Sequence, residues 1–240
     1  MPTAFNQDIQ SSSADSRRNA RNHDTFHFDL SCVDSVNMVD DEGGQCQHPT
    51  MMTSTKVRIG LAATKLLDEG GDAAVTLRSV AERVCVSHNA PYRHFKDRNA
   101  LLAWIVYRAF ENLTQCFTRA LSSGSTSRQA LDQAIDDFIR FGLDYPNRYR
   151  LLFSAQAVVA DEDLKAAAFG CFQIFIKIVS WCQDTRELPQ GDPVRLSGLI
   201  YASMHGAIDL QIGGRSGERK GLGSVREVLD LLLAMLKPKP

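Results

Sequence analysis

The sequence predicts an all-α protein. Apolar residues recur at spacings of three and four along the chain from residue 53 onward, and no convincing apolar–polar alternation indicates a β-strand. Breaks rich in Gly, Ser and Thr, at residues 122–127 and 213–224, separate these periodic runs. The chain has 240 residues, 44% hydrophobic and 23% charged, which is ordinary globular composition with enough length to form a core without disulfides.

Residues 1–52 differ from the rest of the chain. They have neither helical nor strand periodicity and are rich in Ser, Asp, Asn and Gln, so we predict a disordered N-terminal extension. Met51 and Met52 directly precede the first good helix, which suggests the hypothesis that the working start lies there and that the first 50 residues are dispensable. No metal site is expected from the His and Cys residues of this segment, whose spacing matches no standard zinc site: His23, His27, Cys32, Cys46 and His48.

The net charge of −1 averages unlike parts. Residues 1–52 carry −5, whereas residues 53–100 carry +3, so the basic excess is local. The six cysteines are scattered without a C-x-x-C pair, which is typical of buried or free thiols in a reducing compartment. No window approaches the ~18 continuous apolar residues of a membrane span, and the N-terminus lacks the apolar core of a signal peptide. We therefore expect a cytoplasmic protein without a membrane partner.

The first predicted helix lies in "TSTKVRIGLAATKLLDEGG", which begins at Thr53 and stops at the Gly70–Gly71 pair. Thr76 is a suitable N-cap for a second helix that runs through Arg83. Ser87 can cap a third helix. A long fourth helix is predicted from about Arg98 to Leu121, ahead of the break "SSGSTS".

The second and third predicted helices have the proportions of a helix-turn-helix, joined at Val84-Cys85-Val86. The segment "SHNAPYRHF", residues 87–95, is polar at its front and cationic at its back. In a helix-turn-helix, the front of the second helix meets base edges in the major groove. Short capped helices with a few basic residues are also common on solvated faces, so spacing alone leaves both interpretations open.

The run "TLRSVAERVCVSHNAPYRHFKDRNALL", residues 76–102, resembles the DNA-binding signature of the tetracycline-repressor (TetR) family of transcriptional regulators. The resemblance implies a dimeric, all-helical repressor. Its reading head would be a three-helix helix-turn-helix domain at residues 53–100, and its effector-binding and dimerisation bundle would be residues 101–240. The matching positions are Thr76, Ala81, Val86-Ser87, Tyr92, His94-Phe95 and Ala100-Leu101-Leu102.

The segments "YPNRYRLLF" and "IYASMHGAIDL" are similar to one C-terminal class of the family, marked by a tryptophan followed by a His-Gly pair. His205-Gly206 match this class, and Tyr201 stands where the tryptophan is usual. In the head, Cys85 occupies a turn position usually held by glycine. A non-glycine residue at positive φ costs about 1 kcal/mol, so the turn is expected to be shifted or weakened.

The resemblance implies a role for ten residues of the head. The expected base-reading residues are Arg78, His88, Asn89 and Ala90. The expected phosphate-binding residues are Thr76, Ser87, Tyr92, His94, Lys96 and Arg98. Side-chain chemistry agrees for Asn89 and Arg78, which can bond bidentately to adenine and guanine. The predicted DNA partner is a double-stranded, pseudo-palindromic operator.

The body is rich in large apolar groups at helical spacing. Any one of them is also expected in an ordinary core, and a histidine among them is more often a satisfied core residue than a ligand contact. The candidate effector-pocket residues are Phe138, Phe153, Phe172, Phe175, Tyr201 and His205. Helices 193–212 and 224–237 are too apolar for a solvated surface, and we predict that they form the homodimer face.

We expect neither catalytic residues nor a cofactor, because no nucleophile is paired with a base and no carboxylate pair has metal-binding spacing. Two alternatives remain open. One is a helical enzyme or metal protein that uses His205 with Cys171 and Cys182. The other is a helical interaction module that has lost DNA binding, with Cys85 as the lesion.

Overall fold

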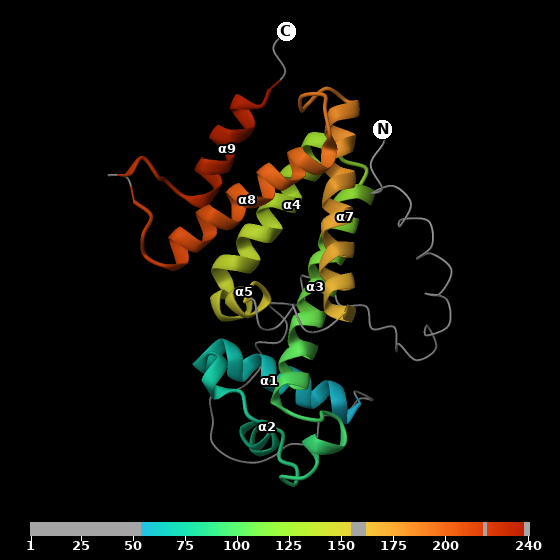
Figure 1. The fold of residues 1–240 in the computed structure, drawn as a ribbon, viewed down its shortest axis with the longest axis vertical. Helices are drawn as coiled ribbons and strands as arrows, with labels where there is room; N and C mark the ends of the chain where they lie inside the picture. Colours follow the sequence, from blue (N-terminus) through green and yellow to red (C-terminus); the bar gives the residue numbers. More distant parts are fainter. Residues whose placement is uncertain (1–53, 155–161, 218–219, 238–240) are drawn as a thin grey trace, which may run out of the picture. The chain divides into compact units, whose positions relative to one another are not determined.

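The computed structural model describes residues 54–154, 162–217 and 220–237, and these ranges are helical (Figure 1). The predicted all-α class is confirmed. In the described ranges, β-type pairing is limited to an isolated antiparallel bridge between Gly217 and Leu222. The predictions for residues 1–52 concern residues outside these ranges.

The first two predicted helices begin and end close to where the sequence places their caps. The elements are α1 (Thr55–Gly70), the 3-10 helix η4 (Asp72–Ala74), α2 (Leu77–Arg83) and the 3-10 helix η5 (Pro91–Arg93). The Thr76 hydroxyl accepts a hydrogen bond from the Ser79 backbone N–H at 2.9 Å, and the Ser79 hydroxyl accepts one from the Thr76 backbone N–H at 3.0 Å. This reciprocal pair satisfies donors that the first turn of α2 leaves unpaired. After α1, the chain leaves the helix at Gly71 with φ 70°, a conformation that favours glycine.

The long helix α3 (Arg98–Ser122) is continuous across the domain boundary predicted at residues 100–101. The Asp97 carboxylate caps it by accepting a hydrogen bond from the Ala100 N–H at 2.8 Å. Near its start, Trp104 packs so closely over Gly60 of α1 that any side chain at Gly60 would collide with the indole ring. Farther along, α3 packs against α4 and α7. The head and the body therefore share one helix.

The remaining helices form the body. They are α4 (Ser127–Asp144), α5 (Pro146–Leu152), α7 (Glu162–Asp184), α8 (Pro193–Ile212) and α9 (Val225–Met235). Helix α7 packs against α3, α4 and α8, and α9 packs on α8 and α4. Arg226 ties α9 to α4, with its guanidinium 2.7 Å from the Asp132 carboxylate and 2.8 Å from that of Asp136.

Within the described ranges, α7 alone is long and apolar enough to cross a membrane by length and composition. Its Cys171, Phe175, Ile178, Val179 and Cys182 are buried inside the bundle. These residues form the face of α7 that packs into the body, and 28% of its most apolar 18-residue window is buried.

Three cysteines behave as the sequence predicts. Cys116, Cys171 and Cys182 are buried free thiols. Burial raises the pKa of Cys116 and Cys182 to about 11 and that of Cys171 to about 12, so all three remain protonated at neutral pH. Cys85 differs from the expectation, since it is disulfide-bonded.

Helix α5 holds the end of α1. The Asn147 amide donates to two backbone carbonyls in the last turn of α1, that of Leu67 at 3.0 Å and that of Asp68 at 3.2 Å. The Arg148 guanidinium donates to both oxygens of the Asp68 carboxylate, with Nε 2.8 Å from Oδ1. These contacts join residues about 80 positions apart in the sequence. They give the body a second attachment to the head besides α3.

Candidate nucleic-acid interface and effector cavity

The turn after α2 has the geometry of a helix-ending motif. The Cys85 N–H donates to the Glu82 carbonyl at 3.2 Å, and the Val86 N–H donates to the Ala81 carbonyl at 3.0 Å. This pair of bonds is typical of a helix end at which one residue, here Cys85, adopts the left-handed backbone conformation. Cys85 has φ 55°, so the position that resembles a family glycine does adopt a glycine-like conformation.

The segment after this turn is not the α-helix that the sequence predicts from Ser87. Its backbone bonds join Ala90 to Ser87, Arg93 to Ala90 and His94 to Pro91, each three residues apart, and the only helical element is η5. The reason is Pro91. Its nitrogen would make the first intrahelical bond, to the Ser87 carbonyl, but it carries no hydrogen. The chain therefore coils tightly through successive turns instead of forming an α-helix.

Two buried residues hold this coiled segment on the head. Pro91 is buried, and the Phe95 ring, which is 4% exposed, packs edge-on against Trp104 with 6.4 Å between ring centroids. The predicted base-reading residues His88 and Asn89 lie exposed between the turn and this anchor.

The other two predicted base-reading residues lie in different settings. Ala90 is half-buried. The Arg78 side chain is 80% exposed on α2, and its Nε lies 3.0 Å from the Glu82 carboxylate. Such exposed ion pairs are weak in water, so the guanidinium can exchange this partner for another.

Most of the predicted phosphate-binding residues are also exposed. They are Thr76, Ser87, Tyr92, His94 and Lys96. The Thr76 hydroxyl is already used as the cap of α2. Arg98 differs from the others, because its Nε donates to the Val75 carbonyl at 2.7 Å and its Nη2 lies 2.8 Å from the Asp72 carboxylate. Its guanidinium therefore fastens η4 to α3.

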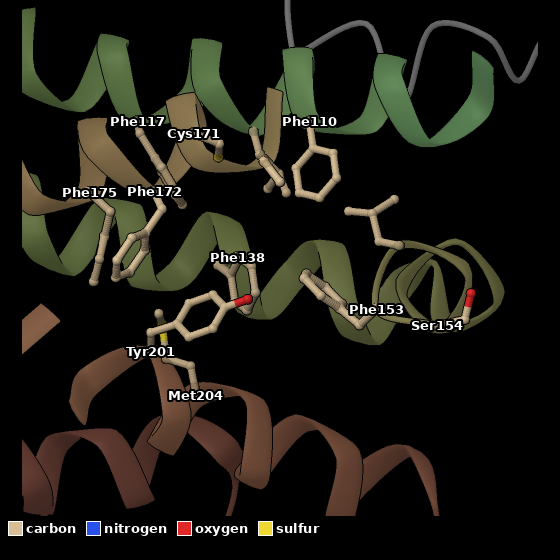
Figure 2. A pocket seen from close by; sticks show the side chains of 13 residues that line it. Phe110, Phe117, Phe138, Phe153, Ser154, Cys171, Phe172, Phe175, Tyr201 and Met204 are labelled. Carbon is tan, nitrogen blue, oxygen red and sulfur yellow. The ribbon is translucent and has the colours of Figure 1, made fainter. Parts of the chain in front are cut away.

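The body contains a cavity of about 390 Å³ between α3, α4, α7 and α8 and the end of α5 (Figure 2). Five of the six residues predicted for an effector pocket line it: Phe138, Phe153, Phe172, Phe175 and Tyr201. The residues of the lining that sequence analysis missed are Phe110, Leu113, Phe117, Leu152, Ser154, Ala168, Cys171 and Met204. Leu113 and Phe117 belong to the apolar stripe of the predicted fourth helix, and this stripe is their only signal in the sequence.

The sixth predicted residue, His205, does not line the cavity but packs behind residues that do. Its ring centroid is 4.2 Å from that of Phe153 and 4.2 Å from that of Tyr201, both of which line the cavity. Its Nδ1 is 2.6 Å from the Tyr149 hydroxyl, while its Nε2 is buried without a hydrogen-bond partner among the described residues. Burial lowers the pKa of His205 to about 4, so the imidazole is neutral at physiological pH.

The described residues that line the cavity carry no formal charge. Its lining consists of apolar side chains with the hydroxyls of Ser154 and Tyr201 and the thiol of Cys171. Burial raises the pKa of Tyr201, which keeps its hydroxyl protonated. The site can thus enclose an uncharged apolar molecule, and it presents no acid, base or nucleophile in a reactive state.

Comparison with known proteins agrees with this two-part organisation. Residues 59–105 match the family described as bacterial regulatory proteins, tetR family, and residues 131–236 match the tetracyclin repressor-like C-terminal domain. The chain belongs to the TetR family. The head with its coiled segment falls in the first match, and most of the cavity falls in the second.

Individual TetR-like relatives are distant. The HTH-type transcriptional activator FasR of Mycolicibacterium smegmatis is 26% identical over 123 residues, which are 50% of this chain and 56% of that protein. An HTH-type transcriptional regulator of Staphylococcus aureus is 24% identical over 88 residues, 37% of this chain and 48% of that protein. The chain thus spans about half the length of the curated relatives that it matches.

Solved structures share the fold over a longer stretch. A Rhodococcus protein of unknown function is 26% identical with a TM-score of 0.68, and the match covers 80% of this chain and all of that one. A TetR-family transcriptional regulator from Pectobacterium atrosepticum is 21% identical with a TM-score of 0.61, over 78% of this chain and 95% of that one.

Proposed function

We propose that this chain is a DNA-binding transcriptional regulator that acts as a homodimer in the cytoplasm and is released from its operator by a small apolar or aromatic effector. The observation that carries the proposal is the pairing of two features. A polar and mostly exposed segment, residues 87–94, is held on the head by the buried residues Pro91 and Phe95. The helix that follows it, α3, contributes to the lining of an uncharged cavity.

In this proposal Asn89 and His88 read bases in the major groove, with Arg78 of α2 beside them. Asparagine suits adenine and arginine suits guanine, because each can make two hydrogen bonds to that base. Ser87, Tyr92, His94 and Lys96 bind phosphates, which supplies affinity and register rather than sequence preference. Arg98 takes part only if it leaves its contacts with Asp72 and Val75.

The dimer face that we propose lies on α8 and α9. Val194 and Leu199 of α8 are 52% and 47% exposed, and Leu231 and Met235 of α9 are 64% and 78% exposed. Large apolar side chains in this number on neighbouring helices favour burial against a partner. A twofold axis through this face would present two reading segments to the two halves of a pseudo-palindromic operator.

Two elements can transmit effector binding to the head. Helix α3 carries lining residues and also packs on α1 through Trp104. Helix α5 leads into Phe153 at the cavity and holds α1 through Asn147 and Arg148. An effector that binds better to one arrangement of these helices shifts the population toward it, by a coupling free energy that is typically about 1–3 kcal/mol.

The proposal is tested with DNA from the region that flanks the gene, in an electrophoretic shift assay at fixed salt. We expect a specific complex. Asn89→Ala should relax base preference at one position, whereas Lys96→Ala should weaken binding to all sequences alike and reduce the salt dependence. The matched control is Gln115→Ala, which removes a side-chain amide at an exposed position of α3 far along the chain from the reading segment.

If the native chain and both head variants bind DNA alike, or if none of them binds, the assignment is refuted. The second of these results favours the alternative of a helical interaction module that has lost DNA binding. Whether binding represses or activates is decided by transcription from the same fragment with and without the protein. We propose repression, although the relative FasR is named an activator.

A further inference from the structure

The cavity contains one polar group that is left without a partner. Ser154 is satisfied, because its hydroxyl donates to the Leu151 carbonyl at 2.9 Å. For the Tyr201 hydroxyl, the described residues supply no hydrogen-bond partner, and Figure 2 shows the ring reaching toward Phe138 on the other side of the cavity. This hydroxyl opens onto the cavity, so a ligand that displaces water from it has to supply a hydrogen-bond partner in return.

A second unmet polar atom lies behind this wall, outside the cavity lining. His205 Nδ1 is bonded to the Tyr149 hydroxyl, and its Nε2 is buried without a partner among the described residues. If Tyr149 donates to Nδ1, then Nε2 carries the proton and needs an acceptor; if Nδ1 donates, then Nε2 needs a donor. Tyr201 both touches His205, with ring centroids 4.2 Å apart, and lines the cavity. The two unmet polar positions are therefore neighbours.

The surroundings exclude a charged ligand group. Among the described residues, no Lys, Arg, Asp or Glu lines the cavity. A carboxylate or ammonium group would lose its hydration there without gaining a counter-ion. An uncharged hydroxyl group is different, because it both donates and accepts, and so it can pair with the Tyr201 hydroxyl in either direction.

We propose that the effector is an uncharged, apolar molecule bearing a hydroxyl group, an alcohol or a phenol, and that the Tyr201 hydroxyl is its hydrogen-bonding partner. This inference rests on the effector-binding part of the proposed function and is independent of DNA binding. The remaining lining residues supply apolar contact and shape.

The test uses three compounds that share one carbon skeleton: biphenyl, 4-phenylphenol and biphenyl-4-carboxylate. Their binding to the purified full-length chain is measured by isothermal titration calorimetry at neutral pH. The informative variant is Tyr201→Phe, which removes one oxygen and keeps the ring. The matched control is Tyr107→Phe, the same change at a half-buried α3 position that does not line the cavity.

We expect Tyr201→Phe to weaken binding of 4-phenylphenol by roughly 10-fold, the usual net value of one hydrogen bond. Binding of biphenyl should change by less than about 2-fold, because the ring and the apolar contacts are retained. Tyr107→Phe should leave both affinities unchanged. The carboxylate should bind at least about 100-fold more weakly than the phenol, since its charge has no partner in the cavity.

Three outcomes overturn the inference: the carboxylate binds as tightly as the phenol, Tyr201→Phe affects biphenyl and 4-phenylphenol equally, or none of the three compounds binds. DNA binding is measured on the same preparations by fluorescence anisotropy. Failed DNA binding with the expected ligand pattern counts against the regulator proposal alone. Intact DNA binding with a failed ligand pattern counts against this inference alone.

Discussion

The contact between Asp68 of α1 and Arg148 of α5 gives a quantitative test of how firmly the body holds the head. The two side chains are 26% and 22% exposed, and they are joined by two parallel hydrogen bonds. Hydrogen bonds to charged groups contribute about 1.5–3 kcal/mol when buried, whereas exposed ion pairs contribute about 0.2–1 kcal/mol. With roughly a quarter of each side chain exposed, we expect a coupling free energy of about 1–2 kcal/mol.

The coupling is measured with a double-mutant cycle. The free energy of unfolding in urea is determined for the native chain, Asp68→Ala, Arg148→Ala and the double variant, and the departure from additivity is the coupling. The control cycle uses Arg78 and Glu82 of α2, whose side chains are 80% and 55% exposed. For this pair, we expect about 0.3–0.5 kcal/mol. A coupling at Asp68–Arg148 no larger than that of the control would refute the view that α5 fastens α1.

Three further outcomes are expected. Gly60→Ala would place a methyl group 2.3 Å from a carbon of the Trp104 ring and should lower the free energy of unfolding by about 1–3 kcal/mol. In contrast, Gly170→Ala in α7, where no atom lies within 4 Å, should raise it by roughly 0.5–1 kcal/mol, and equal urea midpoints would contradict both. Burial lowers the pKa of His205 from 6.5 to about 4, so the unfolded chain takes up this proton at a higher pH than the folded chain. The free energy of unfolding should therefore be retained above pH 6.5 and fall by about 2–3 kcal/mol toward pH 4. Parallel pH profiles for the native chain and His205→Gln would exclude this. Leu231→Glu, at a 64% exposed position of α9, should leave helix content unchanged but convert a dimer into a monomer in sedimentation, and a native chain that is already monomeric would rule out the proposed face.

The start and end of many helices could be predicted because local chemistry determines them. Thr76 caps α2 as predicted, and Gly71 follows α1 with a positive φ. The predicted fourth helix, from about Arg98 to Leu121, matches α3 to within one residue. Each of these features depends on residues within a few positions of one another, which is the range over which a sequence pattern carries information.

The reading segment shows where pattern alone misleads. Ser87 is a good capping residue, and its position after the turn led to the prediction of a third helix there. The missing N–H of Pro91 nevertheless removes the bond that would start an α-helix, and the segment forms η5 and turns instead. Proline is tolerated within the first turn of a helix, where the N–H groups have no intrahelical partner. At its spacing from Ser87, Pro91 lies just beyond that turn.

The cavity could be predicted in part. Its aromatic members stand out in the sequence by their size, but helical spacing does not say which of them border an empty space and which are packed on all sides. Phe110 and Met204 line the cavity, yet neither differs from an ordinary core residue in the sequence. The attachment of Asn147 and Arg148 to α1 leaves no local signal either, because its partners are about 80 residues away.

The shortness of α5 has a mechanical consequence. Its seven helical residues extend only about 10 Å, and a helix of two turns does not bend appreciably when one end is displaced. If a bound effector displaces Phe153, then Arg148 near the other end of α5 moves with it, together with its contact to Asp68 of α1. Wider effectors would then rotate the head farther than narrow ones. The extent of DNA release would therefore depend on the width of the compound.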